Sequence, residues 1–423
     1  MIRITNLLVF WCWVSCSLLF AQKDLTYQTP PPAIANLINA PLTPAVTVNS
    51  SHEWMLLLER SGYPSIEELA QPELRLAGLR INPRTNGQSR GGHYTGMSVK
   101  SLNDSEPMPI QGLPENPKIE NVSWSPDGQK VAFTLTQQAG LELWVADMAN
   151  QQASKLTEPV INDAMRGLPY IWLSDNQTLV YKSLVSDRGD APTASSAPTG
   201  PTVQETTGEK APARTYQDLL KNSQDEALFA YYSTAQLMSI NVETEEVKSL
   251  GEPAIFSEVS PSPDGNYILA TQIQQPFSYL VPYYRFPLSA EVWNQDGERV
   301  QTIAEIPLAE NIPKGFNAVR EGPRDFVWRN DQPATLYWVE AQDGGDPSQE
   351  ADVRDQLFYL AAPFNGEKQA SIPMKLRYNR ITWGDEDLAI ASEYWWSTRQ
   401  LITSTFDPDG GEASKKVLFD RSF

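Results

Sequence analysis

A strand–turn–strand phrase recurs along this chain and constrains its fold more than any other feature. Its clearest copies are Trp124-Ser-Pro-Asp-Gly128, which precedes an alternating run over 131–135, and Ser260-Pro-Ser-Pro-Asp-Gly265, which precedes Tyr267–Ile273. In such a turn Pro presets φ, Asp bonds its own backbone, and Gly accepts positive φ. Because no further oxygen ligands cluster around these Asp residues, a turn is favoured over a cation site. Looser copies begin at Val48, Trp172, Trp328 and Trp383.

The repeat divides the chain into successive units of strands. Each phrase leads into two more strands, and four antiparallel strands in about forty residues make one propeller blade. One such unit cannot bury both faces of its sheet, so neighbouring units must stack. The 33 prolines and 24 glycines also favour many short strands over a helical bundle. We therefore predict an all-β fold, a β-propeller of about six four-stranded blades, and a twisted sandwich is the alternative. The units lie at 45–117, 118–160, 165–254, 255–310, 316–373 and 378–423.

Three segments interrupt the strand pattern and are predicted to be insertions. Residues 185–215 are rich in Pro, Thr, Ser, Ala and Gly, which is typical of a mobile excursion between two strands. A short helix is expected over Tyr216–Tyr232, and a second small helical insertion over 64–80, where apolar residues interleave with glutamates. Decoration of the rim is the simpler interpretation of the helical segments, and recognition of a ligand is the alternative.

The first 21 residues have the pattern of a secretory signal peptide (1–21). Arg3 supplies the positive charge, Leu7–Phe20 are apolar, and the small Ala21 suits cleavage. This apolar stretch is shorter than the roughly 20 residues that span a bilayer. We predict an exported protein, periplasmic or secreted, with 22–44 as an N-terminal extension and 45–423 as the propeller domain.

The cysteine count and the charge exclude several kinds of site. Both cysteines, Cys12 and Cys16, lie within the leader, so the mature chain has neither a disulfide nor a thiolate. Lipoprotein processing before Cys16 and an uncleaved anchor are the alternatives to simple cleavage, after which no membrane contact is expected. With 33 Lys and Arg against 52 Asp and Glu the net charge is −19, which disfavours nucleic-acid binding.

One motif matches the nucleophile elbow of serine hydrolases but lacks its surroundings. Gly87-Gln-Ser89-Arg-Gly91 fits the pattern G-x-S-x-G, whose Ser stands on a strand-to-helix turn, with Asp and then His far downstream. Here an extended segment precedes the motif, no helical pattern follows, and the only later histidine is His93. We predict that Ser89 is not catalytic and that 83–93 form a flexible loop. No residue of this chain is assigned a catalytic role.

No metal or cofactor site is predicted. The two histidines, His52 and His93, belong to different strand segments and are expected at the surface or in turns. Asp343-Gly-Gly-Asp346 is an acidic loop, for which a solvated hairpin is favoured over a cation site. No glycine-rich phosphate loop precedes a helix, so nucleotide binding has no support. A glycosidase would need paired carboxylates, but candidates such as Asp385 and Asp387 stand in ordinary turns.

Several longer phrases are more specific than the generic turn, and they extend from about residue 25 to 422. They are Pro31–Ile34, Leu74–Ile81, Tyr94–Gly96, Thr215–Lys221, Phe286–Trp293, Tyr337–Asp346 and Val417–Ser422. Together they resemble the propeller of glutamyl endopeptidases, which belong to the prolyl oligopeptidase (S9) group of serine peptidases.

The resemblance implies an N-terminal propeller that caps an α/β-hydrolase domain with a Ser, Asp and His triad, and cleavage of peptides after glutamate. The sequence stops at Phe423, and none of the triad residues has a counterpart in it. We therefore expect the substrate-gating propeller of an exported S9 serine peptidase, truncated from seven blades and inactive alone. A stand-alone periplasmic propeller that binds peptides or partner proteins is the alternative.

The same resemblance sets the expected partners. Peptide substrates are the expected partners, and a missing or separately encoded hydrolase domain would cleave them. An open ring exposes strand edges near 25–44 and 415–420, which favours aggregation or an oligomer.

Arg285 is the candidate substrate-binding residue. A guanidinium fork binds a carboxylate bidentately, and Arg285 stands among aromatic residues in the extended run Pro276–Pro287. In a glutamate-directed peptidase it would clamp the substrate carboxylate. The alternative is a structural arginine stacked on Tyr283 or Tyr284.

Overall fold

The computed structural model describes residues 30–103, 106–193 and 215–423. The predicted signal peptide at 1–21 lies outside these residues, as does most of the predicted excursion at 185–215. Nearly all regular structure in the described part is β-strand, and the named strands pair antiparallel. The predicted all-β class is confirmed.

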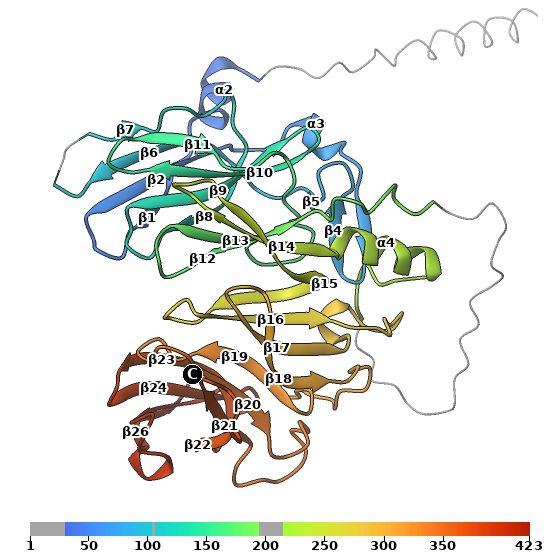
Figure 1. Cartoon of the computed structure of the whole chain (residues 1–423), viewed down its shortest axis with the longest axis vertical. Coiled ribbons are helices and arrows are strands. Elements are labelled where there is room, and N and C mark those ends of the chain that lie inside the picture. Colours follow the sequence, from blue (N-terminus) through green and yellow to red (C-terminus); the bar gives the residue numbers. More distant parts are fainter. Residues whose placement is uncertain (1–29, 104–105, 194–214) are drawn as a thin grey trace, which may run out of the picture.

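The first large sheet has eight strands in two groups (Figure 1). A single residue pair, Tyr94 with Ile119, joins the groups. The first group contains β1 (Ala45–Val48), β2 (Trp54–Arg60), β6 (Tyr94–Ser101) and β7 (Met108–Pro109). The second contains β8 (Ile119–Trp124), β9 (Lys130–Gln137), β10 (Gly140–Asp147) and β11 (Gln152–Lys155).

The second large sheet has seven strands, and the long strand β15 (Val247–Pro261) belongs to both of its groups. Residues of β15 up to Ala254 pair with β14, and those from Ile255 onward pair with β16. The third group therefore holds β12 (Tyr170–Trp172), β13 (Thr178–Ser183), β14 (Ala235–Asn241) and the start of β15. The fourth group holds the end of β15, β16 (Tyr267–Ile273), β17 (Leu288–Asn294) and β18 (Arg299–Ile306).

Two four-stranded sheets complete the series of groups. The fifth group contains β19 (Pro323–Trp328), β20 (Thr335–Ala341), β21 (Asp355–Ala361) and β22 (Gln369–Met374). The sixth contains β23 (Arg377–Asp385), β24 (Leu388–Trp395), β25 (Gln400–Phe406) and β26 (Lys416–Ser422). Figure 1 shows the first two groups at the top of the view, the third and fourth in the middle, and the fifth and sixth together at the bottom.

Each group shares a hydrophobic cluster with the next, because successive side chains of a strand point to opposite faces. In β9, Phe133 packs with residues of β2 and β6, whereas its neighbour Ala132 packs with residues of β12 and β13. In β20, Leu336 packs with β16 and β17, whereas Tyr337 packs with β24 and β25. A cluster between the third and fourth groups completes the series. The sheets are thus held face to face by burial on both sides.

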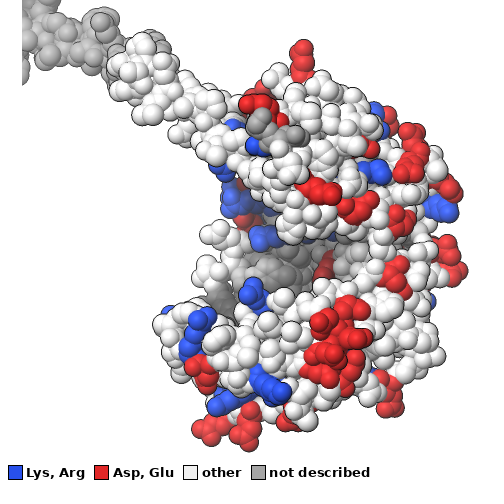
Figure 2. Space-filling view, turned by 90° about the vertical axis from the view of Figure 1, so that its left-hand side faces the viewer, with Lys and Arg blue, Asp and Glu red and all other residues white. Residues whose placement is uncertain are grey.

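The two ends of this stack are uncovered. Strand β26 is exposed along its whole length, with Val417 60% and Phe419 59% exposed. At the other end Val46 of β1 is 53% exposed. In the described part of the chain no sheet closes on itself. Figure 2 shows the surface hollowed between the upper and lower halves of the molecule, with Lys and Arg side chains along the edge of the hollow.

A small cap packs beside the second large sheet, and here the helix predicted over 64–80 is wrong beyond its first turn. Only α3 (Ile66–Leu69) is helical, and Ser65 and Glu68 form its capping box. From residue 74 the sequence alternates Leu-Arg-Leu and Leu-Arg-Ile, and Ala77 and Gly78 turn with φ of 52° and 86°. That alternation has the period of a strand. The result is a three-stranded sheet of β3 (Leu74–Leu76), β4 (Leu79–Asn82) and β5 (Gly87–Gln88).

Helix α4 (Ser223–Ser233) completes the cap and begins later than the helix predicted over 216–232. Its N-cap is Asn222, whose side chain accepts a hydrogen bond from the backbone N–H of Asp225 at 2.9 Å. Phe229 of α4 is buried in one cluster with β3, β4 and the short helix η1 (Tyr283–Arg285). This cluster fixes the cap against the sheets.

The remaining helices are α2 (Pro32–Ile38) and η2 (Glu412–Ser414). None of the helices in the described ranges has both the length and the apolar character needed to cross a membrane.

Candidate functional site

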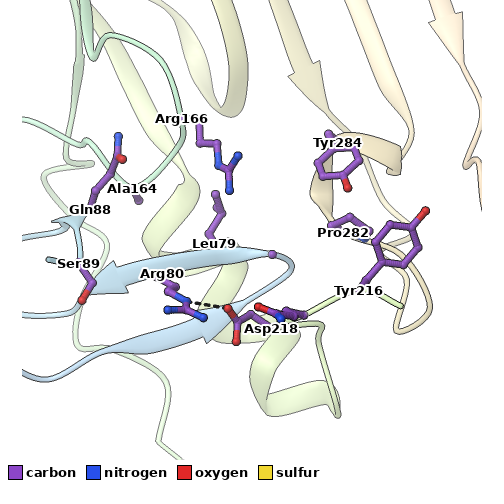
Figure 3. A pocket seen from close by; sticks show the side chains of 12 residues that line it. Leu79, Arg80, Gln88, Ser89, Ala164, Arg166, Tyr216, Asp218, Pro282 and Tyr284 are labelled. Atoms are coloured by element: carbon purple, nitrogen blue, oxygen red, sulfur yellow. Dashed lines mark hydrogen bonds and ion pairs between the residues drawn. The ribbon is translucent and has the colours of Figure 1, made fainter. Parts of the chain in front are cut away.

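The cap lines an open cavity of about 450 Å³. Its walls are β4, the connection between β11 and β12, and the segments before α4 and η1 (Figure 3). Arg80 Nε and Asp218 Oδ2 pair at 2.7 Å, and the backbone N–H of Gly78 donates to Asp218 O at 2.8 Å. These contacts join β4 to the segment before α4. The Arg166 side chain points into the cavity. The polar lining comprises Arg80, Gln88, Ser89, Arg166, Tyr216, Gln217, Asp218 and Tyr284.

A second cavity, of about 640 Å³, lies between the fourth group of strands and the fifth and sixth groups. Tyr284 lines both cavities, so the two adjoin around η1. The second cavity contains cations and carboxylates together, and Arg324 pairs with Asp325 at 3.3 Å. Its polar lining comprises Ser257, Glu258, Thr271, Tyr283, Tyr284, Arg320, Arg324, Asp325, Tyr378 and Asn379.

Three ionisable side chains have shifted pKa values because they are withdrawn from water: Asp163 in the connection before β12, Lys182 on β13 and Glu258 on β15. Burial raises the pKa of Asp163 to about 7 and lowers the pKa of Lys182 to about 8. Burial, followed by the charge of Asp325, raises the pKa of Glu258. The Asn121 amide donates to Asp163 Oδ2 at 3.0 Å. The charge of this interior therefore changes near neutral pH.

Arg285 lies at the end of η1 and is half-buried, next in sequence to Tyr284, which lines both cavities. Its guanidinium carbon is 5.8 Å from the centroid of the Tyr216 ring. Tyr283 and Tyr284 pack edge-to-face on each other at 5.7 Å. The alternative that placed Arg285 on one of those two rings is therefore wrong about the aromatic partner, which is Tyr216.

Ser89 lies on the rim of the first cavity, at the end of β5. Its hydroxyl donates to Glu73 at 2.9 Å. His93 Nδ1 is 3.6 Å from Glu68 Oε1, and burial lowers the pKa of His93. Within the described ranges no hydrogen bond joins Ser89 to His93. The segment 83–93 is not the flexible loop that its composition predicts, because it contains β5 and Thr85 and Asn86 are buried.

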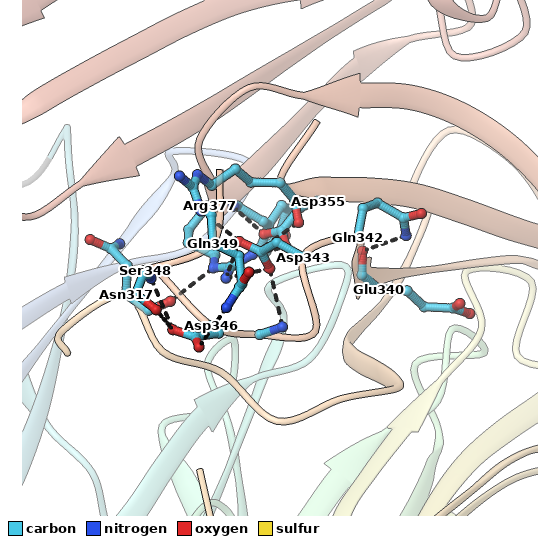
Figure 4. Close-up of polar contacts among 12 residues, drawn as sticks. Asn317, Glu340, Gln342, Asp343, Asp346, Ser348, Gln349, Asp355 and Arg377 are labelled. Atoms are coloured by element: carbon cyan, nitrogen blue, oxygen red, sulfur yellow. Dashed lines mark hydrogen bonds and ion pairs between the residues drawn. The ribbon is translucent and has the colours of Figure 1, made fainter. Parts of the chain in front are cut away.

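At Asp343 the acidic loop 343–346 belongs to a buried ion network, so the predicted solvated hairpin is wrong at this residue (Figure 4). The Asp343 side chain has no exposed surface, and Arg377 Nη2 donates to both of its oxygens at 2.6 and 2.8 Å. Arg354 Nη1 donates to Asp343 at 2.8 Å, and Arg377 Nη1 donates to the equally buried Asp355 at 3.0 Å. The composition of the loop does not predict that Arg354 and Arg377 pair with Asp343. Asp346 remains near the surface and accepts a hydrogen bond from the Ser348 N–H at 2.9 Å.

The other predicted residues are not brought together. His52 stands in a turn with φ of 58°, and Asp385 and Asp387 are exposed at the turn between β23 and β24. In the part of the chain that the structure describes, no group of three or more His, Cys, Asp and Glu side chains is arranged to hold a metal ion. The cations that line or adjoin the cavities include Arg166 and Arg320, which sequence reasoning missed because only the fold brings their segments together.

Two plant proteins are similar to this chain. A probable chloroplastic glutamyl endopeptidase of Oryza sativa subsp. japonica is 37% identical over 412 residues, which are 94% of this chain and 44% of that protein. A protein of the same name from Arabidopsis thaliana is 37% identical over 410 residues, 94% of this chain and 42% of that protein. The chain thus spans less than half the length of the relatives it matches. No family model matches the chain.

Solved structures with low sequence identity are also similar to the chain. The acylaminoacyl peptidase of Pyrococcus horikoshii has a TM-score of 0.43 at 12% identity, covering 91% of this chain and 47% of that one. A prolyl endopeptidase structure has a TM-score of 0.45 at 12% identity, covering 91% of this chain and 43% of that one.

Proposed function

This chain is a relative of the glutamyl endopeptidases of the prolyl oligopeptidase group, and on that premise we propose that it forms the substrate-gating propeller of a serine peptidase. The observation that carries the proposal is the 37% identity that extends over 94% of the chain. We propose further that the Ser, Asp and His triad belongs to a hydrolase part outside these 423 residues.

The propeller interpretation is supported by how the groups of strands pack. Four strands in chain order, a shared cluster with each neighbour, and alternate burial on both faces are what stacked blades require. We propose that the six groups are blades of a ring truncated from seven, since the outer faces of the first and last groups are left exposed. The predicted leader supports export to the periplasm or beyond.

The proposed substrates are peptides with a glutamate at the cleaved bond. The names of the two relatives support the preference for glutamate. The cavities around η1 support binding of a peptide, because they combine tyrosine rings with cationic side chains. In this proposal the propeller admits and orients the peptide, and the hydrolase part supplies the nucleophile, the base and the oxyanion hole.

Reconstitution tests the proposal. The chain is mixed or fused with the hydrolase part of a glutamyl endopeptidase, and cleavage of a fluorogenic Glu peptide is measured. We expect cleavage after Glu to require both parts, and Arg285→Ala to raise KM for Glu substrates selectively. Absence of association and of any effect of the chain on cleavage would contradict the proposal, and an unchanged Glu preference in Arg285→Ala would contradict the role of Arg285.

The second candidate function is a stand-alone propeller that binds peptides or partner proteins. The exposed apolar residues of β26, such as Val417 and Phe419, favour it because uncovered strand edges pair with other chains. Stable capture of a partner on β26, with no effect of the chain on a hydrolase part, would support this alternative.

A further inference from the structure

Two arginines, Arg285 and Arg320, meet at the short segment that follows β18. The backbone N–H of Ala309 donates to Arg285 O at 2.9 Å, and Arg320 Nη2 donates to Pro307 O at 2.6 Å. Arg320 lines the second cavity, and Arg285 faces Tyr216, which lines the first. Arg320 therefore faces the second cavity, and Arg285 belongs to η1, around which the two cavities adjoin.

Neither guanidinium is fully paired. The Nε atoms of Arg285 and Arg320 are both buried, and neither has a hydrogen-bond partner within the described ranges. No carboxylate of those ranges lies within ion-pair distance of either side chain. Burial and the nearby charge of Arg285 together lower the pKa of Arg320. Two neighbouring like charges that each have one nitrogen withdrawn from water, with no counter-ion in the described ranges, are unfavourable, and a bound anion relieves that cost.

The two arginines that are buried in the described part of the chain, Arg329 and Arg377, show what full pairing looks like. Arg329 is only 2% exposed and donates to both Asp331 and Asp409. Arg377 is 3% exposed and donates to Asp343, Asp355 and two backbone carbonyls. Arg285 and Arg320 differ from them, because the Nε donor of each has no hydrogen-bond partner in the described ranges.

The surroundings select the kind of anion. Guanidinium groups bind carboxylates through paired N–H donors, and the tyrosine rings at the cavities offer apolar surface for the stem of an acidic side chain. Glu258 and Asp325 line the second cavity as well, and the chain carries a net charge of −19. Ligands with several negative charges, such as nucleotides, are therefore repelled.

We propose that Arg285 and Arg320 together bind the carboxylate of an acidic side chain in a peptide that enters between the two cavities. The choice of a peptide rests on the proposed function. The site itself belongs to this chain and needs no hydrolase part.

Binding to the chain alone tests the site. A fluorescently labelled peptide with one central Glu and its Gln counterpart, both with blocked termini, are titrated with the protein and followed by anisotropy. We expect the Glu peptide to bind about tenfold more tightly than the Gln peptide, since hydrogen bonds to a charged group are stronger than neutral ones. Arg320→Gln and Arg285→Gln each abolish that difference, and Arg320→Lys retains part of it.

The matched control is Arg299→Gln, because the Arg299 side chain is 63% exposed and lies on β18 away from the cavities. It should keep the full preference for the Glu peptide. Thermal unfolding of each variant shows whether it is folded, and Arg320→Lys keeps the test valid if Arg320→Gln does not fold. Equal affinity for the two peptides, or a preference that survives in Arg320→Gln, overturns the site. Failure of reconstitution with a preserved Glu preference overturns only the proposed function.

Discussion

Replacement of Arg377 by Met tests whether the acidic loop is a structural ion network. Arg377 donates to Asp343, to Asp355 and to the backbone carbonyls of Asn317 and Arg354, and both carboxylates have no exposed surface. Methionine has a similar length but donates no hydrogen bond. Removing one partner of a buried ion pair costs about 3–5 kcal/mol, because the remaining charge stays buried.

The expected loss of unfolding free energy in Arg377→Met stays within that range, because Arg354 still pairs with Asp343 and Arg324 still pairs with Asp355. Urea unfolding followed by tryptophan fluorescence measures it, and we expect the midpoint to fall by about 1 M. The matched control is Arg299→Met, because the Arg299 side chain is 63% exposed and its partner Glu291 keeps hydrogen bonds from Gln272, Ser289 and Trp293. We expect its loss to be about 0–1 kcal/mol. A midpoint for Arg377→Met equal to that of Arg299→Met would refute the reasoning, because it would mean that the loop is solvated.

Three further predictions concern pH, association and reactivity. The folded pKa of Asp163, about 7, lies above its ordinary 3.8, so its contribution to stability is complete below about pH 4 and lost as the pH rises through 7. The thermal midpoint of Asp163→Asn should therefore rise relative to that of the wild type between about pH 4 and about pH 7 and keep a constant difference above that; parallel profiles would contradict this. Val417→Lys with Phe419→Lys should reduce self-association in sedimentation, because charged residues on an edge strand oppose pairing; an unchanged size distribution would speak against it. A fluorophosphonate probe should not label the chain, and modification of Ser89 would overturn its non-catalytic assignment.

The groups of strands could be predicted because their signals are local. A Pro-Asp-Gly turn such as that ending at Gly128 fixes where one strand stops and the next begins. In the structure Gly128 has φ of 69°, and the strands on either side, β8 and β9, pair as the pattern predicts. Alternation then determines the two buried faces, which is why Phe133 and Ala132 belong to different clusters.

The errors arose where distant segments decide the outcome. Over 64–80 the glutamates favoured a helix, but Leu76 and Ile81 bury themselves against α4 and η1 with the period of a strand. The composition of the loop at Asp343 predicts a solvated hairpin, but Arg354 at the end of the same connection and Arg377 of β23 both pair with Asp343. In each case the deciding contact joins residues that no local pattern relates.

The sequence predicts only part of the candidate site, because distant segments form it. Arg285 stood out among aromatic residues, but its aromatic partner is Tyr216 rather than a neighbour in sequence. Arg320 carries no local signal, since its importance comes from a single contact to Pro307 beside Arg285. A site assembled from coil segments between strands is set by tertiary packing, which sequence patterns do not report.

The proposed gating of substrates by the propeller can be measured as the ratio of two cleavage rates, one for a short Glu peptide and one for a large folded protein, with the hydrolase part alone and with the chain added. We expect the chain to preserve or raise cleavage of the peptide and to suppress cleavage of the folded protein. A ratio that the chain leaves unchanged, although the two parts associate, would contradict it.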